Sequence, residues 1–261
     1  MGFMSLLGVG QPPAAGGGAF TCDAVTFDGT NDYLTRGADL TGNADGRHGM
    51  CSFWIKADPA NFTDGYAIVY IAVSDRMDIL IFSDGTVYCY MQDSTGLSSL
   101  STTTTLTIQT NSWSHVGIWW DTDYALNSKI LEIYIDNTLD TNAPIDTGAL
   151  AFDIDYTQTE HWVGAYTDAT GKINGDFAEF YLNFATGLDL GVASNMEKFR
   201  TSGGKPVDLG SDGSRATGTA PIIYLHVGNG GATSDFVSND GSGGGMTENG
   251  ALAIAATSPS D

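Results

Sequence analysis

The sequence predicts an all-β protein: an antiparallel jelly-roll β-sandwich with one short helix and a glycine-rich C-terminal wrap. In residues 129–136, apolar Leu131, Ile133 and Ile135 alternate with Glu132, Tyr134 and Asp136, the period of a strand with one buried and one wet face. Residues 176–184 alternate in the same way. No helical pattern of comparable length interrupts residues 113–184, which favours antiparallel pairing between neighbouring strands.

The N-terminal half supplies further predicted strands. Residues 24–27 form a first strand, and the Asp- and Gly-rich turn at 28–32 leads into a second short one. Asp84-Gly85 between two apolar runs predicts a hairpin of 77–82 with 87–91. The β-branched residues of segment 98–107 favour an edge strand there. The remaining strands are predicted at 51–56, 66–73, 114–120 and 162–166.

The C-terminal part follows a different pattern. Leu190, Ala193, Met196 and Phe199 recur every three residues, which predicts a helix over 189–200 that ends before Gly203-Gly204. Residues 222–227 predict one more strand, and 251–256 form either a last strand or an arm. We therefore expect an N-terminal arm or linker at 1–20 and a jelly-roll domain at 21–261. Within that domain, residues 186–261 pack as a helix plus a C-terminal extension.

Charge and composition exclude several classes of function. The 261 residues carry a formal net charge of −21 and contain no clustered Lys/Arg stripe, so direct nucleic-acid binding is disfavoured. No apolar stretch approaches the length of a membrane span. No Lys or Arg precedes Arg36, so we expect no signal peptide and synthesis in the cytoplasm.

The three cysteines, Cys22, Cys51 and Cys89, show no metal-type spacing. The favoured interpretation is that all three are small buried hydrophobic residues in a reducing cytoplasm. The alternative is one disulfide and one free thiol.

Several stretches together resemble the laminin-G-like, concanavalin A-like lectin and glucanase jelly roll. The resemblance covers residues 23–185 and is carried by Asp28-Gly29-Thr30-Asn31-Asp32 and by segments 25–34, 53–56, 113–116, 131–136 and 175–181. Segments 197–199, 204–213 and 219–225 are similar to the tail that follows this jelly roll in tailed-phage virion proteins.

This resemblance implies a non-enzymatic structural component of a bacteriophage virion. Such a protein is a capsid decoration protein or a tail-fibre accessory that docks on the major capsid or tail protein as a homo-oligomer, with a trimer expected. Its location is then the virion. The alternative is a glycan-binding module that attaches the particle to a host-surface glycan, and a glycan depolymerase is a less favoured third hypothesis.

The enzyme hypothesis rests on a carboxylate motif. Glucanases of this fold resemble one another in a Glu-x-Asp-x-x-Glu strand that holds two carboxylates across the scissile bond. The nearest match is Glu132 and Asp136, which alternation places on one face, but the middle Asp and the second Glu are missing. We therefore expect no catalytic residues and no enzymatic activity.

Two binding sites are proposed from residue type alone. Asp28 and Asp32 are the candidate ligands for Ca²⁺, the one cofactor considered, because Ca²⁺ prefers carboxylate and carbonyl oxygens. The default explanation for these two residues is that they form local Asp turns. Trp54 and Trp119 are the candidate glycan-binding residues among four tryptophans that could stack on sugars. The other two are Trp120 and Trp162; three of the four are expected in the core.

Overall fold

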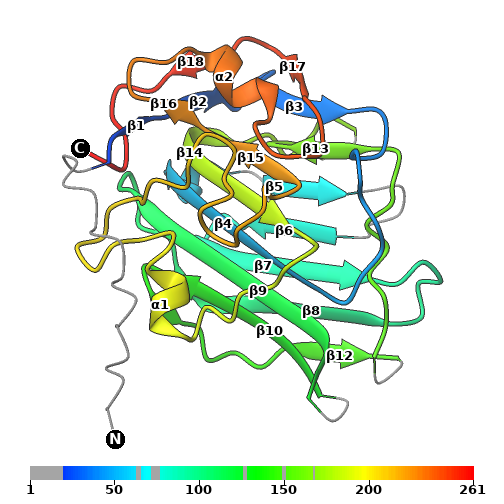
Figure 1. Cartoon of the computed structure of the whole chain (residues 1–261). Helices are drawn as coiled ribbons and strands as arrows, with labels where there is room; N and C mark the ends of the chain where they lie inside the picture. The colour runs from blue at the N-terminus through cyan, green and yellow to red at the C-terminus, as the bar shows by residue number, and fades with distance from the viewer. Residues whose placement is uncertain (1–19, 63–65, 72–76, 126–127, 149–150, 167) are drawn as a thin grey trace, which may run out of the picture.

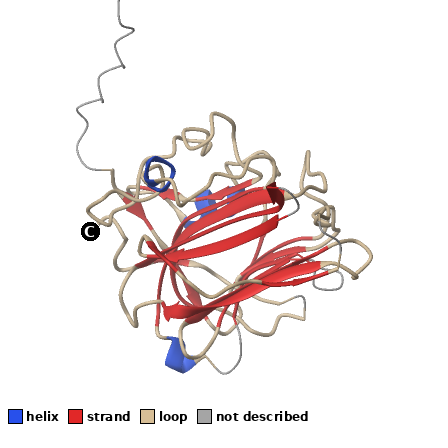
Figure 2. Ribbon diagram, turned by 90° about the horizontal axis from the view of Figure 1, so that it is seen from below, coloured by secondary structure: helices blue, strands red, loops and turns tan. Residues whose placement is uncertain are grey.

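The computed structural model describes residues 20–62, 66–71, 77–125, 128–148, 151–166 and 168–261. The arm or linker predicted at residues 1–20 therefore lies outside the described residues, except for its last residue. The described chain folds into two large antiparallel sheets that face each other (Figures 1 and 2). We call them the front sheet and the back sheet, after their positions in Figure 1.

The front sheet has the strand order β11-β10-β9-β4-β14-β2-β18, and β15 also pairs with β14. Its longest strands are β4 (His48–Ala57), β9 (Ser114–Ala125), β10 (Ser128–Ile135) and β14 (Asn174–Asn183). The shorter strands are β2 (Val25–Asp28), β11 (Thr138–Leu139), β15 (Ile223–Leu225) and β18 (Ala253–Ile254).

The back sheet has the order β12-β8-β7-β6-β5-β13-β3-β17. Its strands are β3 (Tyr33–Arg36), β5 (Tyr66–Ile71), β6 (Met77–Ile81), β7 (Thr86–Gln92), β8 (Ser99–Thr107), β12 (Ile145–Thr147), β13 (His161–Val163) and β17 (Thr247–Asn249). A separate ribbon pairs β1 (Cys22–Asp23) with β16 (Val227–Gly228). The helical segments are the 3₁₀ turn η1 (Pro59–Asn61), α1 (Ala193–Met196) and α2 (Thr233–Ser238).

The main core lies between the two sheets because apolar side chains alternate inward on both. Phe53, Ile118 and Phe177 enter it from the front sheet, and Ile79 and Cys89 enter it from the back sheet. Cys22, Cys51 and Cys89 are all buried and free, as the favoured interpretation predicted.

A second apolar cluster lies on the outer side of the front sheet. Residues 188–217, which we call the cover segment, place Leu190, Met196 and Phe199 against the outward-facing Trp119 and Tyr181. In Figure 1 this yellow segment, with α1, crosses in front of β9 and β10. The front sheet is therefore packed against protein on both faces where the cover segment lies.

Two sequence predictions need correction, and one alternative that the sequence left open is decided. The helix predicted at 189–200 is helical only over α1, and a second short helix, α2, was not predicted. The segment at 98–107 forms β8, but β12 pairs along its outer side, so β8 is not an edge strand. Segment 251–256, which could have been a strand or an arm, contains the strand β18. This strand pairs with β2 and is the edge strand of the front sheet.

Candidate functional site

The proposed calcium ligands Asp28 and Asp32 hold a turn together. Asp28 Oδ1 accepts hydrogen bonds from the backbone N–H groups of Thr30 (2.7 Å) and Asn31 (3.0 Å). These bonds, led by that from Thr30, hold the pKa of Asp28 below its usual value. Asp32 is 3% exposed; its Oδ2 accepts from Asp28 N at 3.1 Å and its Oδ1 from Ala251 N at 2.8 Å. The default explanation, a local Asp turn, therefore accounts for both carboxylates.

Among the described residues, no group of three or more His, Cys, Asp or Glu side chains is placed to hold a metal ion. Calcium binding at Asp28 and Asp32 stays a prediction.

Both proposed glycan-stacking tryptophans are buried. Trp54 is 2% exposed and packs at 4.9 Å from the His115 ring under Ala255 of the C-terminal extension. Trp119 is 4% exposed, lies under the cover segment and donates its indole N–H to Glu132 at 2.8 Å. Burial leaves little ring surface for a sugar at either position, although Trp119 also lines a cavity of about 230 Å³ beside His48.

The carboxylates considered for glycosidase chemistry do not form a pair. Glu132 Oε2 accepts from Trp119 and, at 2.6 Å, from the hydroxyl of Tyr134. Asp136 follows the end of β10 with φ +51°, so the strand alternation expected to place it beside Glu132 does not reach it. Its Oδ1 accepts the His115 N–H at 3.0 Å. Both groups serve the packing of the front sheet.

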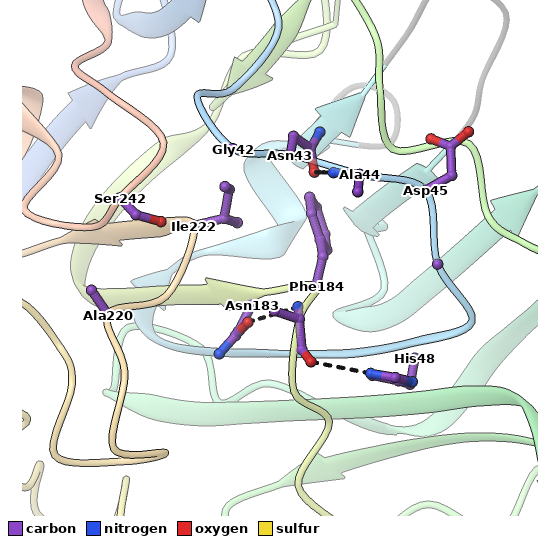
Figure 3. A pocket seen from close by; sticks show the side chains of 12 residues that line it. Gly42, Asn43, Ala44, Asp45, His48, Asn183, Phe184, Ala220, Ile222 and Ser242 are labelled. Atoms are coloured by element: carbon purple, nitrogen blue, oxygen red, sulfur yellow. Dashed lines mark hydrogen bonds between the residues drawn. The ribbon is translucent and has the colours of Figure 1, made fainter.

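A cavity of about 280 Å³ opens at one end of the sandwich (Figure 3). The loop before β4, the end of β14 and the C-terminal extension line it. Figure 3 shows the Phe184 ring standing between Ile222 and Ala44. Asn43 donates to Tyr156 O at 2.6 Å, and Asn183 Oδ1 accepts the Ala185 N–H at 2.9 Å. Much of its polar lining is thus bonded within the protein, which leaves few groups to orient a ligand.

A second cavity, of about 230 Å³, borders the first at His48 and Ala185. His48 Nε2 lies 3.2 Å from the Ala185 carbonyl oxygen, so this contact forms the wall between the two cavities. Asp121 and Trp120 contribute to the second cavity. We regard this pair of cavities as the less favoured candidate site.

The favoured candidate site is an aromatic platform on the outer face of the back sheet. Because Leu34, Val163, Ile79 and Cys89 point into the core, their neighbours along the strands point outward. These outward side chains gather around Leu80 and are partly exposed. The aromatic platform consists of Tyr33, Phe82, Tyr88, Tyr90, Trp162 and Tyr166.

Ring contacts order the platform in two groups, Tyr33 with Trp162 and Phe82 with Tyr88 and Tyr90, and packing around Leu80 joins the two groups. Tyr33 stacks on Trp162 with centroids 5.3 Å apart and an interplanar angle of 17°. Tyr88 stacks on Tyr90 at 6.4 Å and 14°, and it contacts Phe82 at 5.8 Å. Such contacts limit side-chain freedom before any ligand arrives, so less entropy is lost on binding.

Cross-strand pairing adds polar groups to this surface. Trp162 pairs with Thr35 on β3, Asp78 pairs with Tyr90 on β7, and Tyr90 pairs with Ser101 on β8. Burial, reinforced by Asp78, raises the pKa of Tyr88 to about 12, so its phenol stays protonated at neutral pH. The platform therefore combines apolar ring faces with hydroxyl groups, while the Asp78 carboxylate among them is only 8% exposed.

Of these residues, sequence reasoning had named only Trp162 as available for stacking. The period of two along β6 and β7 indicated which residues face outward. It could not show that residues of β3, β13, β6 and β7 meet, because that depends on the strand order.

The sequence matches no family model and no curated protein. Among solved structures, the chain is similar to a native heptameric SAP-like pentraxin from Limulus polyphemus, with 14% identity, a TM-score of 0.53 and coverage of 89% of this chain and 94% of that one. It is also similar to a proposed carbohydrate binding protein from Bacteroides ovatus, with 16% identity and a TM-score of 0.59. That alignment covers 92% of this chain and 61% of the other, so this chain spans less than two thirds of that protein.

These likenesses show that the chain has an antiparallel jelly-roll β-sandwich fold, which confirms the fold class predicted from the sequence. At 14% and 16% identity they establish the fold alone. No helix in the described residues is long and apolar enough to span a membrane.

Proposed function

We propose that the protein is a glycan-binding module that holds sugars on the aromatic platform of the back sheet. The observation that carries this proposal is the stacked pair Tyr33 and Trp162, which packing around Leu80 joins to Tyr88 and Tyr90. These rings lie on the outer face of the back sheet, whereas the cover segment packs on the front sheet. Sugar rings have apolar C–H faces and polar hydroxyl rims, so they fit a surface of aromatic faces and hydroxyl groups. The likeness to a proposed carbohydrate binding protein supports the same reading.

The test is a polysaccharide binding screen with wild-type protein and the variants Trp162→Ala and Tyr90→Ala. We expect each variant to bind about tenfold more weakly, which corresponds to ~1.4 kcal/mol. The matched control is Tyr124→Ala, which removes an aromatic side chain that is 48% exposed on the front sheet. Equal losses in all three variants, or no loss in either platform variant, would refute the proposal.

The phage hypothesis stays a prediction. Neither of the two similar structures is described as a phage protein, and docking on a capsid or tail protein and trimer formation stay predictions as well. A glycan-binding face is compatible with a tail or fibre location, because attachment to a host surface needs such a face. The expectation that the protein is not an enzyme also stays a prediction.

A further inference from the structure

We infer that the ligand of the aromatic platform is an extended, uncharged glycan chain that lies across the strands of the back sheet. This inference rests on the proposed glycan-binding function and adds the length, direction and charge of the ligand. Three features of the back sheet carry it: the direction of one row of paired residues, the spacing of the rings along that row, and the charges on the strands.

The row runs perpendicular to the strands. Thr35 pairs with Trp162, Trp162 with Tyr70, Tyr70 with Asp78, and Asp78 with Tyr90. Beyond Tyr90, Ser101 continues the row, and it pairs in turn with Ile145 on the edge strand β12. Residues that are direct partners in an antiparallel sheet lie side by side, so this row is straight across the sheet.

The spacing of the rings exceeds a single sugar. Trp162 on β13 and Tyr90 on β7 are separated by three strand intervals, about 14 Å at the usual spacing of strands. A monosaccharide on one ring leaves the other uncovered, whereas a chain of several sugars along the row contacts both. Thr35 and Ser101 lie next to these two rings. The Thr35 hydroxyl oxygen accepts from Asn249 Nδ2 at 3.1 Å, so its own proton is what it can donate to the same chain.

The charges on this sheet disfavour an acidic chain. Among the residues assigned to back-sheet strands, Arg36 is the one Lys or Arg. Its guanidinium already donates to the carbonyl oxygens of Asp39 and Gly245, both at 3.0 Å, so it is committed to the loops beside the sheet. Asp78 lies within the row between Trp162 and Tyr90, and the whole chain carries a net charge of −21. A uronate or sulfate group on the row would meet repulsion from Asp78, and among the described strand residues of the back sheet there is no uncommitted Lys or Arg to pair with it.

The test is calorimetric titration with two ladders of oligosaccharides, from a single ring to a hexamer. One ladder is a set of neutral gluco- and xylo-oligosaccharides, and the other is oligogalacturonides, measured at low and high salt. We expect affinity for the neutral ladder to rise at least tenfold from one ring to the plateau. We expect the acidic ladder to bind at least tenfold more weakly. High salt should reduce this difference in affinity, because it screens the repulsion between like charges.

Variants separate the possible outcomes. Tyr90→Ala should flatten the dependence of affinity on chain length, because one end of the row is lost, while Tyr124→Ala should leave it unchanged. Asp78→Asn should raise the ratio of acidic to neutral affinity. Two results would overturn the inference and leave the proposed function intact. One is a monosaccharide that binds as tightly as the hexamer, and the other is an acidic ladder that binds more tightly than the neutral one in a manner that depends on Trp162. Binding that Trp162→Ala does not weaken would overturn the proposed function itself.

Discussion

Glu179 is an ionisable side chain buried on the outer side of the front sheet. It lies at a bulge of β14 with φ +50°, is 3% exposed, and accepts the Tyr224 hydroxyl at 2.7 Å. Its Oε1 lies 3.8 Å from the His226 ring, whose other nitrogen is 3.0 Å from Asp240. Burial raises the pKa of Glu179 from 4.5 to about 8.

The raised pKa predicts a pH dependence of stability. The folded state holds this proton more tightly than the unfolded state does. The contribution of protonated Glu179 to the free energy of unfolding is therefore complete below pH 4.5 and is lost as the pH rises through about 8. We expect the urea midpoint of Glu179→Gln to fall less than that of the wild type between pH 5 and pH 9, since glutamine stays neutral. The control is Glu197→Gln on the exposed side of the cover segment. Parallel curves for wild type and Glu179→Gln would contradict this assignment.

Tyr156 anchors the inner core through its hydroxyl group. That oxygen accepts the buried Trp120 indole N–H at 2.6 Å, and the ring stacks on Phe184 at 3.9 Å. Tyr156→Phe keeps the stack but leaves the indole without an acceptor, so we expect a loss of about 1–3 kcal/mol. Chemical unfolding measures it, with Tyr124→Phe as an exposed control. A loss no larger than that of the control would show that the hydrogen bond adds nothing.

Single residues also mark where prediction from sequence ends. Alternation correctly indicated that Trp119 and Trp120 point to opposite faces. It could not show that the outer one is covered, because the covering residues, such as Phe199, lie about eighty positions later in the chain. A wet face inferred from a strand is exposed only if no distant segment packs on it.

At the scale of elements, the cover segment is held by apolar packing rather than by helix formation. Phe199 contacts Tyr181 at 5.1 Å, edge to face, and is 3% exposed. We expect Phe199→Ala to cost about 3–5 kcal/mol and to open residues 188–217 to proteases. The control is Val192→Ala in the same segment, where the side chain is 46% exposed. Resistance to proteolysis equal to that of the control would show that Phe199 is not the anchor.

The short length of α1 shows why the predicted helix was partly wrong. The apolar spacing of Leu190, Met196 and Phe199 was correct, since all three are buried against the front sheet. A run of turns produces the same contacts, with Gly191 near its start and Asn195 donating to Asp189 O at 2.9 Å. The apolar stripe therefore predicted which residues are buried. It did not predict the backbone conformation, because Asn and Gly form turns readily.

At the scale of the whole molecule, we expect the excess of acidic residues to keep the molecules apart in solution at neutral pH. The net charge of −21 vanishes near the sequence isoelectric point of about 4.1. We therefore expect light scattering to rise sharply as pH falls toward 4 and to reverse on return to pH 7, because mutual repulsion is lost. Solutions that stay clear at pH 4 would indicate that charge is not what keeps the molecules apart.

The fold class was predictable because strand alternation and turn residues are local signals. The candidate site was not, because its residues come together only through the strand order β7-β6-β5-β13-β3. Tyr33 and Trp162 are 129 positions apart in the chain, yet their rings stack. The periodicity of apolar residues along the sequence does not indicate which strands pair when they lie so far apart in the chain.

The alternation of inward and outward residues along β7 has a consequence for how such a surface can change over evolutionary time. Val87, Cys89 and Met91 hold the core, while Tyr88 and Tyr90 face outward. Mutations at the outward positions can alter what is recognised without a matching loss of foldability. A lineage could therefore retain this scaffold while its recognition diversifies, and a combinatorial library restricted to the same positions would be a practical starting point for new specificities.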